Sequence, residues 1–232
     1  MDELILKPIA YIKTDLPEKF GVPRQSGLVP DLKGRIVFEP EYRDNNALRE
    51  LDRYTHLWLI WGFSENRKKE GWEPTVRPPR LGGNTRVGVF ASRSPYRPNP
   101  LGLTVVKLES VEKTADNGNV ILVSGTDMTD NTPIYDIKPY LPYVDSIPDA
   151  SDGFALADKE GALEVSFMKK AALLLSEEDK RVLEQLLAQD PRPQYQNENN
   201  RIYVMRFKNY EVSFTVEDKT VTVLNVITTV NG

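Results

Sequence analysis

Guanidinium and carboxyl groups stand beside prolines in four short polar segments, and these are the residues best suited to chemistry. The segments read VPRQSG (22–27), RPPRLGGNTR (77–86), SRSPYRPNPLG (92–102) and TDMTDNTPIYDIKPYLPY (126–143). Proline fixes its own φ and restricts the residue before it, so a side chain in such a loop loses less entropy when it binds a partner. The pattern predicts rigid presentation of arginines to an anionic group. The alternative is that the prolines stiffen surface loops and the arginines form ordinary ion pairs.

The distribution of charge favours a local anionic partner. The chain has a net charge of −4, whereas residues 72–97 hold five arginines and one glutamate, a local charge of +4. A net acidic protein does not attract nucleic acids indiscriminately, because long-range attraction follows the summed charge. One basic segment on an acidic chain therefore indicates a specific anionic ligand at that segment.

Composition excludes several common kinds of active site. The chain has no cysteine, which excludes disulfides, thiolate nucleophiles and cysteine-based zinc sites, and no spacing typical of a metal site occurs. The single histidine, His56, is expected to be a partly buried core residue. The sequence has neither a G-x-x-x-x-G-K-[ST] phosphate loop nor a G-x-S-x-G nucleophile elbow. Its longest apolar run, about 57–63, is too short for a membrane helix, and no secretory signal is seen, so a cytoplasmic location is expected.

Mostly strands are expected to position the four polar segments. Period-two patterns predict strands at 86–92, 103–113 and 120–128, and a strand buried on both faces at 56–63. The Asn-Gly pair at 117–118 favours a type I′ hairpin turn, and hairpins imply antiparallel pairing. Residues 45–54 predict a short helix capped by Asn45 or Asn46. The predicted fold class is mainly β, with a single antiparallel β-barrel domain over residues 1–148.

A small α+β domain is predicted after the barrel, over residues 149–232. Residues 144–158 are rich in Asp, Ser, Pro and Gly, which is typical of a linker. Ser176 is the expected N-cap of a helix that carries three acidic residues in its first turn. Alternation at 210–217 predicts a half-buried strand, and a turn at 217–220 leads into a partner strand at 221–230.

Taken together, four segments resemble the TrmO/YaeB (TsaA-like) family. They are VPRQSG, the run from 71 to 104, DIKPYLPY (136–143) and LAQDPRPQY (187–195). The resemblance covers nearly the whole chain, and 71–104 is its most specific part. It implies an antiparallel barrel with a small C-terminal domain, S-adenosyl-L-methionine as cofactor, and a homodimer with no membrane or DNA partner. The implied reaction is methylation of N6 of N6-threonylcarbamoyladenosine at position 37, in the anticodon loop of tRNA. Two alternatives stay open: a non-catalytic RNA-binding barrel, and a methyltransferase of the same fold that acts on a small molecule.

The resemblance also implies cofactor contacts in four parts of the chain. They are Pro23, Arg24, Gln25, Ser64, Glu65, Arg93, Leu103, Asp130, Asn131, Thr132 and Pro133. Relatives often have His-Gln where this chain has Ser64-Glu65, which leaves the contacts at those two positions open. Many have Gly in place of Asn131. Asn adopts positive φ more readily than most residues, so the turn is expected to survive.

The implied reaction also needs a proton acceptor, because N6 loses a proton when it is methylated. We hypothesise that Asp136 accepts this proton, that Lys138 is its charge partner, and that Tyr140 hydrogen-bonds or stacks. The alternative is a structural pair of Asp136 and Lys138 at the barrel rim.

Arginine's planar fork suits both the threonyl carboxylate and phosphates. The candidate RNA contacts are Arg77, Arg80, Arg86, Arg97, Arg192 and Tyr195. For Arg192 and Tyr195, a structural turn after the helix is an equal alternative.

Overall fold

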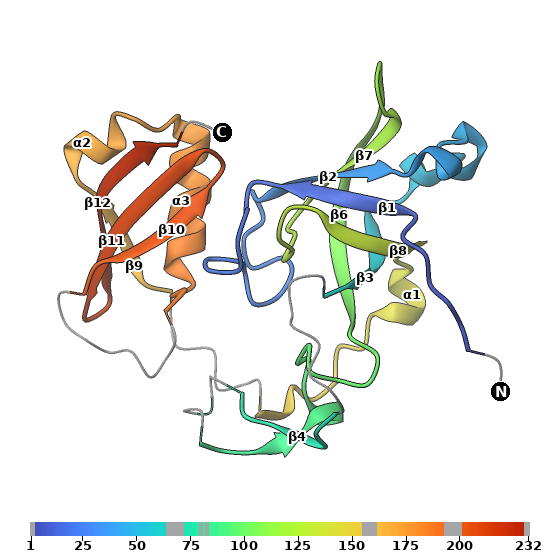
Figure 1. Cartoon of the computed structure of the whole chain (residues 1–232), viewed down its shortest axis with the longest axis horizontal. Coiled ribbons are helices and arrows are strands. Elements are labelled where there is room, and N and C mark those ends of the chain that lie inside the picture. Colours follow the sequence, from blue (N-terminus) through green and yellow to red (C-terminus); the bar gives the residue numbers. More distant parts are fainter. Residues whose placement is uncertain are drawn as a thin grey trace.

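The structure is a computed structural model of the 232-residue chain, and it describes residues 3–63, 72–78, 81, 84–154, 162–192 and 201–229. Two groups of strands dominate it. The first forms a barrel from the blue-to-yellow part of the chain, and the second forms a smaller sheet with its helices in the orange-to-red part (Figure 1). Each group encloses its own cluster of buried hydrophobic side chains.

Six antiparallel strands close the barrel in the order β1-β2-β7-β6-β3-β8. Their bounds are β1 Ala10–Thr14, β2 Lys33–Phe38, β3 His56–Gly62, β6 Leu101–Thr114, β7 Gly118–Ser124 and β8 Thr132–Pro139. The predicted β6–β7 hairpin forms, but the prediction of a type I′ turn is wrong. The loop is the three residues 115–117 between the paired Thr114 and Gly118, and of the Asn-Gly pair only Gly118 has positive φ, 66°. The predicted mainly β fold with a closed antiparallel barrel is confirmed.

The alternating burial along strand β3 shows which of its side chains point into the barrel. Leu57, Leu59 and Trp61 are buried, whereas Trp58 and Ile60 between them are only half-buried. Successive side chains of a strand point to opposite faces, so every second apolar residue packs inside the barrel. The prediction that this strand is buried on both faces is therefore wrong. His56, at its start, is half-buried as expected.

Two predicted elements before β6 are also wrong. Residues 45–54 form two short 3-10 helices, Asn45–Leu48 and Leu51–Arg53, separated by Glu50 with a φ of 67°. The side chain of Asp44 caps the first of them by accepting a hydrogen bond from the backbone N of Asn46. In place of a strand at 86–92 the chain has the two-residue strand β5 (Val87–Gly88), which pairs with β4 (Thr75–Val76). A 3-10 helix at Val89–Ala91 then turns the chain, because Ser92 N bonds back to Val89 O.

The second sheet has the order β10-β11-β12-β9, with β9 parallel to β12. Its elements are β9 Glu164–Phe167, α2 Lys169–Ala172, α3 Glu177–Ala188, β10 Tyr203–Phe207, β11 Tyr210–Glu217 and β12 Thr220–Thr228. The Ser176 side chain caps α3 by accepting a hydrogen bond from Asp179 N at 3.1 Å, as predicted. Leu183 and Leu186 are among the residues that α3 buries against the sheet.

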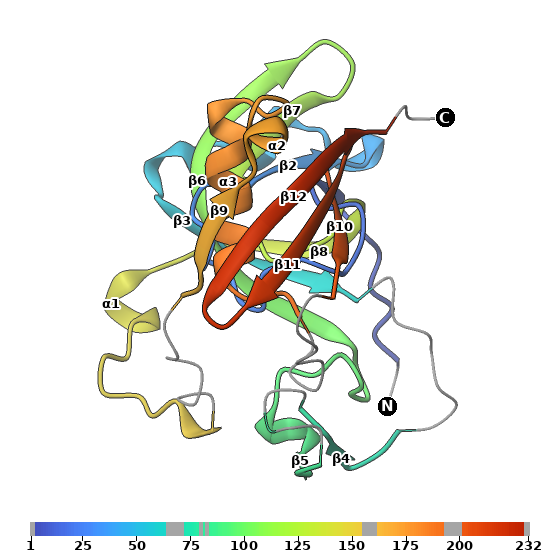
Figure 2. The same cartoon turned by 90° about the vertical axis from the view of Figure 1, so that its left-hand side faces the viewer.

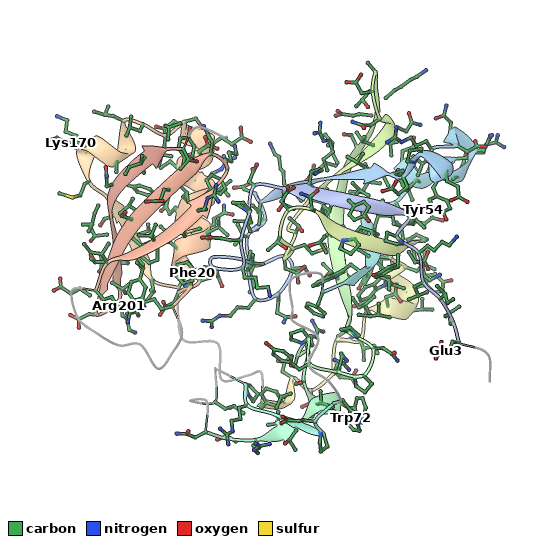
Figure 3. All side chains as sticks on the ribbon, viewed as in Figure 1. Glu3, Phe20, Tyr54, Trp72, Lys170 and Arg201 are labelled. Atoms are coloured by element: carbon green, nitrogen blue, oxygen red, sulfur yellow. The ribbon has the colours of Figure 1, made fainter. Side chains whose placement is uncertain are left out.

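The connection between β1 and β2 packs against this second sheet. Leu16, Val29 and Leu32 are fully buried in its hydrophobic cluster, and the Phe20 ring stacks on Phe214 at 6.3 Å between centroids (Figure 3). Asp31 accepts hydrogen bonds from the side chains of α3. Residues 15–32 thus connect the barrel to the second core and hold the two together.

The short helix α1 (Pro142–Asp145) follows β8. Among the described residues, none of the helices has the length and apolarity needed to cross a membrane.

Candidate functional site

A cavity of about 800 Å³ opens where β3 ends and β6 begins. Its lining comes from the loop between β1 and β2, the last residues of β3, residues 93–99, the start of β6 and the segment between β7 and β8. A volume of this size is typical of small-molecule and cofactor sites.

The cavity collects predicted residues from distant parts of the sequence. The predicted cofactor contacts among its lining residues are Pro23, Arg24, Gln25, Arg93, Leu103 and Thr132. Arg97, predicted to contact RNA, lines it as well. The barrel therefore brings three of the four proline-rich polar segments to one cavity.

Two glycines let the first of these segments approach the barrel. Gly27 N donates to Gly125 O at 2.9 Å, and both residues have positive φ, 76° and 73°. A Cβ on Gly125 would lie 3.4 Å from the backbone of Gly27, an ordinary contact, so it is the positive φ that favours glycine at this position. The loop is also fixed at its side chains, because Arg93 donates to Gln25 and Arg24 donates to the backbone O of Asp190 at 2.9 Å.

Asp130, Asn131 and Pro133 do not line this cavity; they shape the turn into β8. The Asp130 carboxylate accepts a hydrogen bond from Thr14 N at 3.0 Å, and the Asn131 side chain accepts one from Lys13. Asn131 has a φ of 62°, so the expectation that the turn tolerates Asn in place of Gly is confirmed. Pro133 is buried opposite Tyr11 of β1. Ser64 and Glu65 lie outside the described residues.

The three residues hypothesised to act in catalysis lie near one another, but none of them lines the cavity. The Lys138 ammonium lies 2.9 Å from the Asp136 carboxylate, and the two side chains are 61% and 44% exposed. Tyr140 packs against the Trp58 ring with 5.8 Å between centroids. Trp58 lines the cavity, so Tyr140 is linked to the cavity through its contact with the Trp58 ring.

The described residues among the predicted RNA contacts lie in three places: next to β4 and β5, at the cavity, and beside Asp190. Arg77 and Arg86 lie next to β4 and β5. The described residues between 72 and 91, which carry these two strands, form an arm that projects from the lower part of the molecule in Figure 2. Arg86 donates to the Thr75 hydroxyl at 2.7 Å, and Arg97 donates to the backbone O of Ser92 at 3.0 Å. Arg192 binds both oxygens of Asp190, at 2.8 and 2.9 Å, which raises the pKa of its guanidinium and supports the structural alternative. Arg80 and Tyr195 lie outside the described residues.

The arm also carries exposed aromatic side chains that the sequence analysis did not single out. The side chains of Trp72 and Phe90 are 54% and 71% exposed, and their ring centroids are 6.0 Å apart (Figure 3). Exposed aromatic rings beside arginines are typical of surfaces that stack unpaired bases. Alternation of aromatic and basic residues in 72–97 is the sequence signal that would have found them.

A hydrogen-bonded chain at the wall of the cavity involves residues that were not predicted from the sequence. The indole Nε1 of Trp61 donates to Thr104 Oγ1 at 2.9 Å, and Thr104 Oγ1 donates to Asp127 Oδ1 at 2.9 Å. Burial raises the pKa of Asp127 to about 6, although hydrogen bonds from Thr104 and backbone amides and the charge of Arg93 act in the opposite direction. The available signal was Thr104, a polar residue in the inward register of a strand whose next inward residues, Val106 and Leu108, are apolar.

The described cavity fits the chemical groups of S-adenosyl-L-methionine. Arg24 and Arg93 provide guanidinium groups for the carboxylate of the cofactor. Trp61 and Phe63, whose ring centroids are 4.4 Å apart, give the cavity an aromatic wall for a purine ring.

Comparisons with known proteins agree with this architecture over its whole length. The chain matches two family models, the tRNA-methyltransferase O N-terminal domain over residues 11–146 and the TrmO C-terminal domain over residues 160–229. A tRNA (adenine(37)-N6)-methyltransferase of Escherichia coli (strain K12) is 40% identical over 227 residues, covering 94% of this chain and 95% of that protein. One of the same name from Eikenella corrodens is 44% identical over 180 residues, covering 77% of this chain and 99% of that protein.

Solved structures show the same fold. The crystal structure of TrmO from Pseudomonas aeruginosa superposes with a TM-score of 0.81 at 32% identity, covering 98% of each chain. With both family models matched in order and relatives similar along almost their entire length, this chain belongs to the TrmO family.

Proposed function

We propose that this protein is an S-adenosyl-L-methionine-dependent methyltransferase that modifies N6 of the adenine at position 37 of tRNA. Two relatives that match it over 95% and 99% of their own length carry the name tRNA (adenine(37)-N6)-methyltransferase. The observation that carries the proposal is the cavity itself, whose lining includes Arg24, Gln25 and Arg93 together with Trp61 and Asp127. The substrate that suits these cations is N6-threonylcarbamoyladenosine, because its threonyl group adds a carboxylate to the base.

When bound, S-adenosyl-L-methionine supplies a methyl group on a positively charged sulfur, which departs as a neutral thioether. The residues of the chain then have to bind the anionic groups, align N6 with the methyl group and exclude water. Alignment of two reactants in such a site is worth about 7–11 kcal/mol of the barrier. The proline-fixed loops that carry Arg24, Arg93 and Arg97 suit this task, because their side chains are already held by hydrogen bonds.

The arm is the proposed surface for the anticodon loop. Arg77 and Arg86 provide positive charge for phosphates, and the exposed rings of Trp72 and Phe90 provide faces for unpaired bases. An anticodon-loop base is already unpaired, so turning it toward the cavity costs less than flipping a base from a duplex.

We also propose that the protein acts in the cytoplasm as a homodimer, with residues 1–148 carrying the methyl-transfer site and residues 149–232 a second domain. The roles of Asp136, Lys138 and Tyr140 stay predictions, as do the cofactor contacts at Ser64, Glu65, Asp130, Asn131 and Pro133. Asp136→Asn tests the first of these. If this variant binds cofactor and tRNA normally and turns over near the wild-type rate, Asp136 is not the proton acceptor.

Two measurements test the proposed function against the alternatives. Calorimetry with S-adenosyl-L-methionine is expected to show saturable binding, whereas a non-catalytic RNA-binding barrel would show none. Mass spectrometry of nucleosides is expected to find a methyl group added to N6-threonylcarbamoyladenosine when the protein, cofactor and modified tRNA are mixed. Cofactor binding with no methylation of this nucleoside would favour a small-molecule substrate.

A further inference from the structure

Asp127 stands apart from the rest of the cavity in its charge. Among the described lining residues it is the only one with a carboxyl group, whereas Lys19, Arg24, Arg93 and Arg97 carry positive charge. The reaction proposed above releases one proton from N6, and a base must accept it in or near the cavity. Asp136 is paired with Lys138 and does not line the cavity. The position of Asp127 therefore makes it the better placed of the two carboxylates.

A hydrogen bond from Thr104 fixes the orientation of the Asp127 carboxylate. The indole N–H of Trp61 can only donate, so Thr104 Oγ1 accepts at that contact, 2.9 Å away. The single hydroxyl proton of Thr104 then points to Asp127 Oδ1, also at 2.9 Å. Oδ1 therefore accepts the Thr104 hydroxyl proton, and this hydrogen bond fixes how the Asp127 carboxylate is oriented at the cavity wall.

We propose that Asp127 is the proton acceptor of the methyl transfer, and that Thr104, fixed by Trp61, is the residue that positions it. This inference rests on the proposed function and names one group in its mechanism. In the balanced step, the N6–C bond forms as the C–S bond breaks, and the sulfur keeps the electron pair. The N6–H bond breaks at the same stage, and its proton moves to the Asp127 carboxylate.

The environment of Asp127 suits a base that works near neutral pH. Burial raises its pKa to about 6, so the carboxylate is ionised at pH 7 yet more basic than an exposed aspartate. The charged and polar groups that face it are Arg93, the Thr104 hydroxyl and the backbone amides of Ser26 and Asp127. Each of these lowers the pKa, so removal of the Thr104 hydroxyl is expected to raise it further.

Four variants test the assignment. Asp127→Asn keeps the size of the side chain and an acceptor for Thr104 but cannot take a proton. Thr104→Val removes the donor, and Thr104→Ser retains it. Asp116→Asn makes the same change as the first variant at an exposed residue in the β6–β7 turn, and serves as the matched control.

The readouts are a carboxyl-carbon NMR titration of Asp127 in the cofactor-free protein, calorimetry with S-adenosyl-L-methionine, and the pH dependence of single-turnover methylation of tRNA. We expect wild-type turnover to fall below about pH 6. Asp127→Asn is expected to bind the cofactor within about threefold of wild type and to lose about 10²–10⁴-fold in the single-turnover rate. Thr104→Val is expected to raise the Asp127 pKa by NMR and to move the acidic limb of the rate profile upward by the same amount. Thr104→Ser is expected to restore both.

Three results would overturn the inference while leaving the proposed function intact. The first is an Asp127→Asn variant that turns over within about tenfold of wild type. The second is an Asp127→Asn variant that loses cofactor affinity while its single-turnover rate at saturating cofactor is unchanged. The third is a Thr104→Val variant in which the Asp127 pKa measured by NMR shifts but the pH dependence of the rate does not. A wild-type protein that binds cofactor but never methylates this tRNA would instead overturn the proposed function, and this inference with it.

Discussion

The indole of Trp61 lies directly against the α-carbon of Gly102, its register partner on the neighbouring strand β6. A Cβ atom at position 102 would come within 2.2 Å of Trp61 Cε2, which no real contact allows. Trp61 in turn holds Thr104 and forms part of the cavity wall. The absence of a side chain at 102 therefore determines where this wall stands.

Gly102→Ala is expected to displace the Trp61 ring, because backbone and indole cannot both stay in place. We expect a loss of about 1–3 kcal/mol in the free energy of unfolding, as for other overpacked core sites, and weaker cofactor binding. Chemical denaturation and calorimetry measure the two effects. Gly88→Ala is the control, since a Cβ there meets nothing within 4 Å. If the two variants had the same stability and the same cofactor affinity, the contact between Gly102 and Trp61 would not determine either property.

The pKa of Asp127 predicts how the stability of the cofactor-free protein depends on pH. The folded-state pKa of about 6 lies above the ordinary value of 3.8, so ionisation of Asp127 opposes folding. Its favourable contribution below pH 3.8 is lost as the pH rises through 6. Asp127→Asn is therefore expected to be more stable than wild type at pH 7, by up to about 3 kcal/mol, and to lose this advantage near pH 4. Thermal unfolding at the two pH values measures the difference. If Asp127→Asn were more stable than wild type by the same amount at both pH values, Asp127 would not be desolvated in the folded protein.

Lys208 joins the two cores through charge. Its ammonium binds the buried Asp179 of α3 and lies 3.7 Å from Asp15 after β1, and its backbone N donates to Asp15 O at 2.7 Å. Lys208→Met leaves Asp179 buried without its cation, so we expect the free energy of unfolding to fall by about 3 kcal/mol.

Lys33→Met is the control for this experiment, because the pair of Lys33 with Glu178 is solvent-exposed on both sides. Denaturant titration is expected to show no measurable change for that variant. A Lys208→Met variant as stable as the control would contradict the proposed importance of the buried pair.

Removal of arm arginines is expected to change how tRNA affinity depends on salt. If Arg77 and Arg86 each contact a phosphate of the single-stranded loop, Arg77→Ala and Arg86→Ala each lower the slope of log K against log salt by about 0.7. Filter binding or fluorescence anisotropy at several salt concentrations measures the slope. Arg53→Ala serves as control, since this exposed arginine pairs with Glu50 on a different part of the surface. Slopes that do not differ from the control would exclude both residues as phosphate contacts.

Several elements follow from local sequence alone. The Ser176 cap and the apolar face of α3 were predicted because a helix start and a 3.6-residue period are written in neighbouring residues. The β6–β7 hairpin was predicted for the same reason, although its loop has three residues with a left-handed Gly118 in place of the predicted type I′ turn. The strand at 86–92 was predicted wrongly, because a 3-10 turn at Val89–Ala91 competes with strand pairing and no period reveals it.

The sequence by itself determined the chemical character of the site: prolines that fix arginines, the absence of thiols, and the motifs that resemble one family. Only the tertiary structure decided that Asp127 rather than Asp136 lines the cavity, and that a glycine at 102 sets the position of Trp61. The physical reason is that closure of a six-stranded barrel brings together residues that are about a hundred positions apart. Which of them face one cavity depends on strand register and on the inward or outward direction of each side chain, and these are set by packing across the whole barrel.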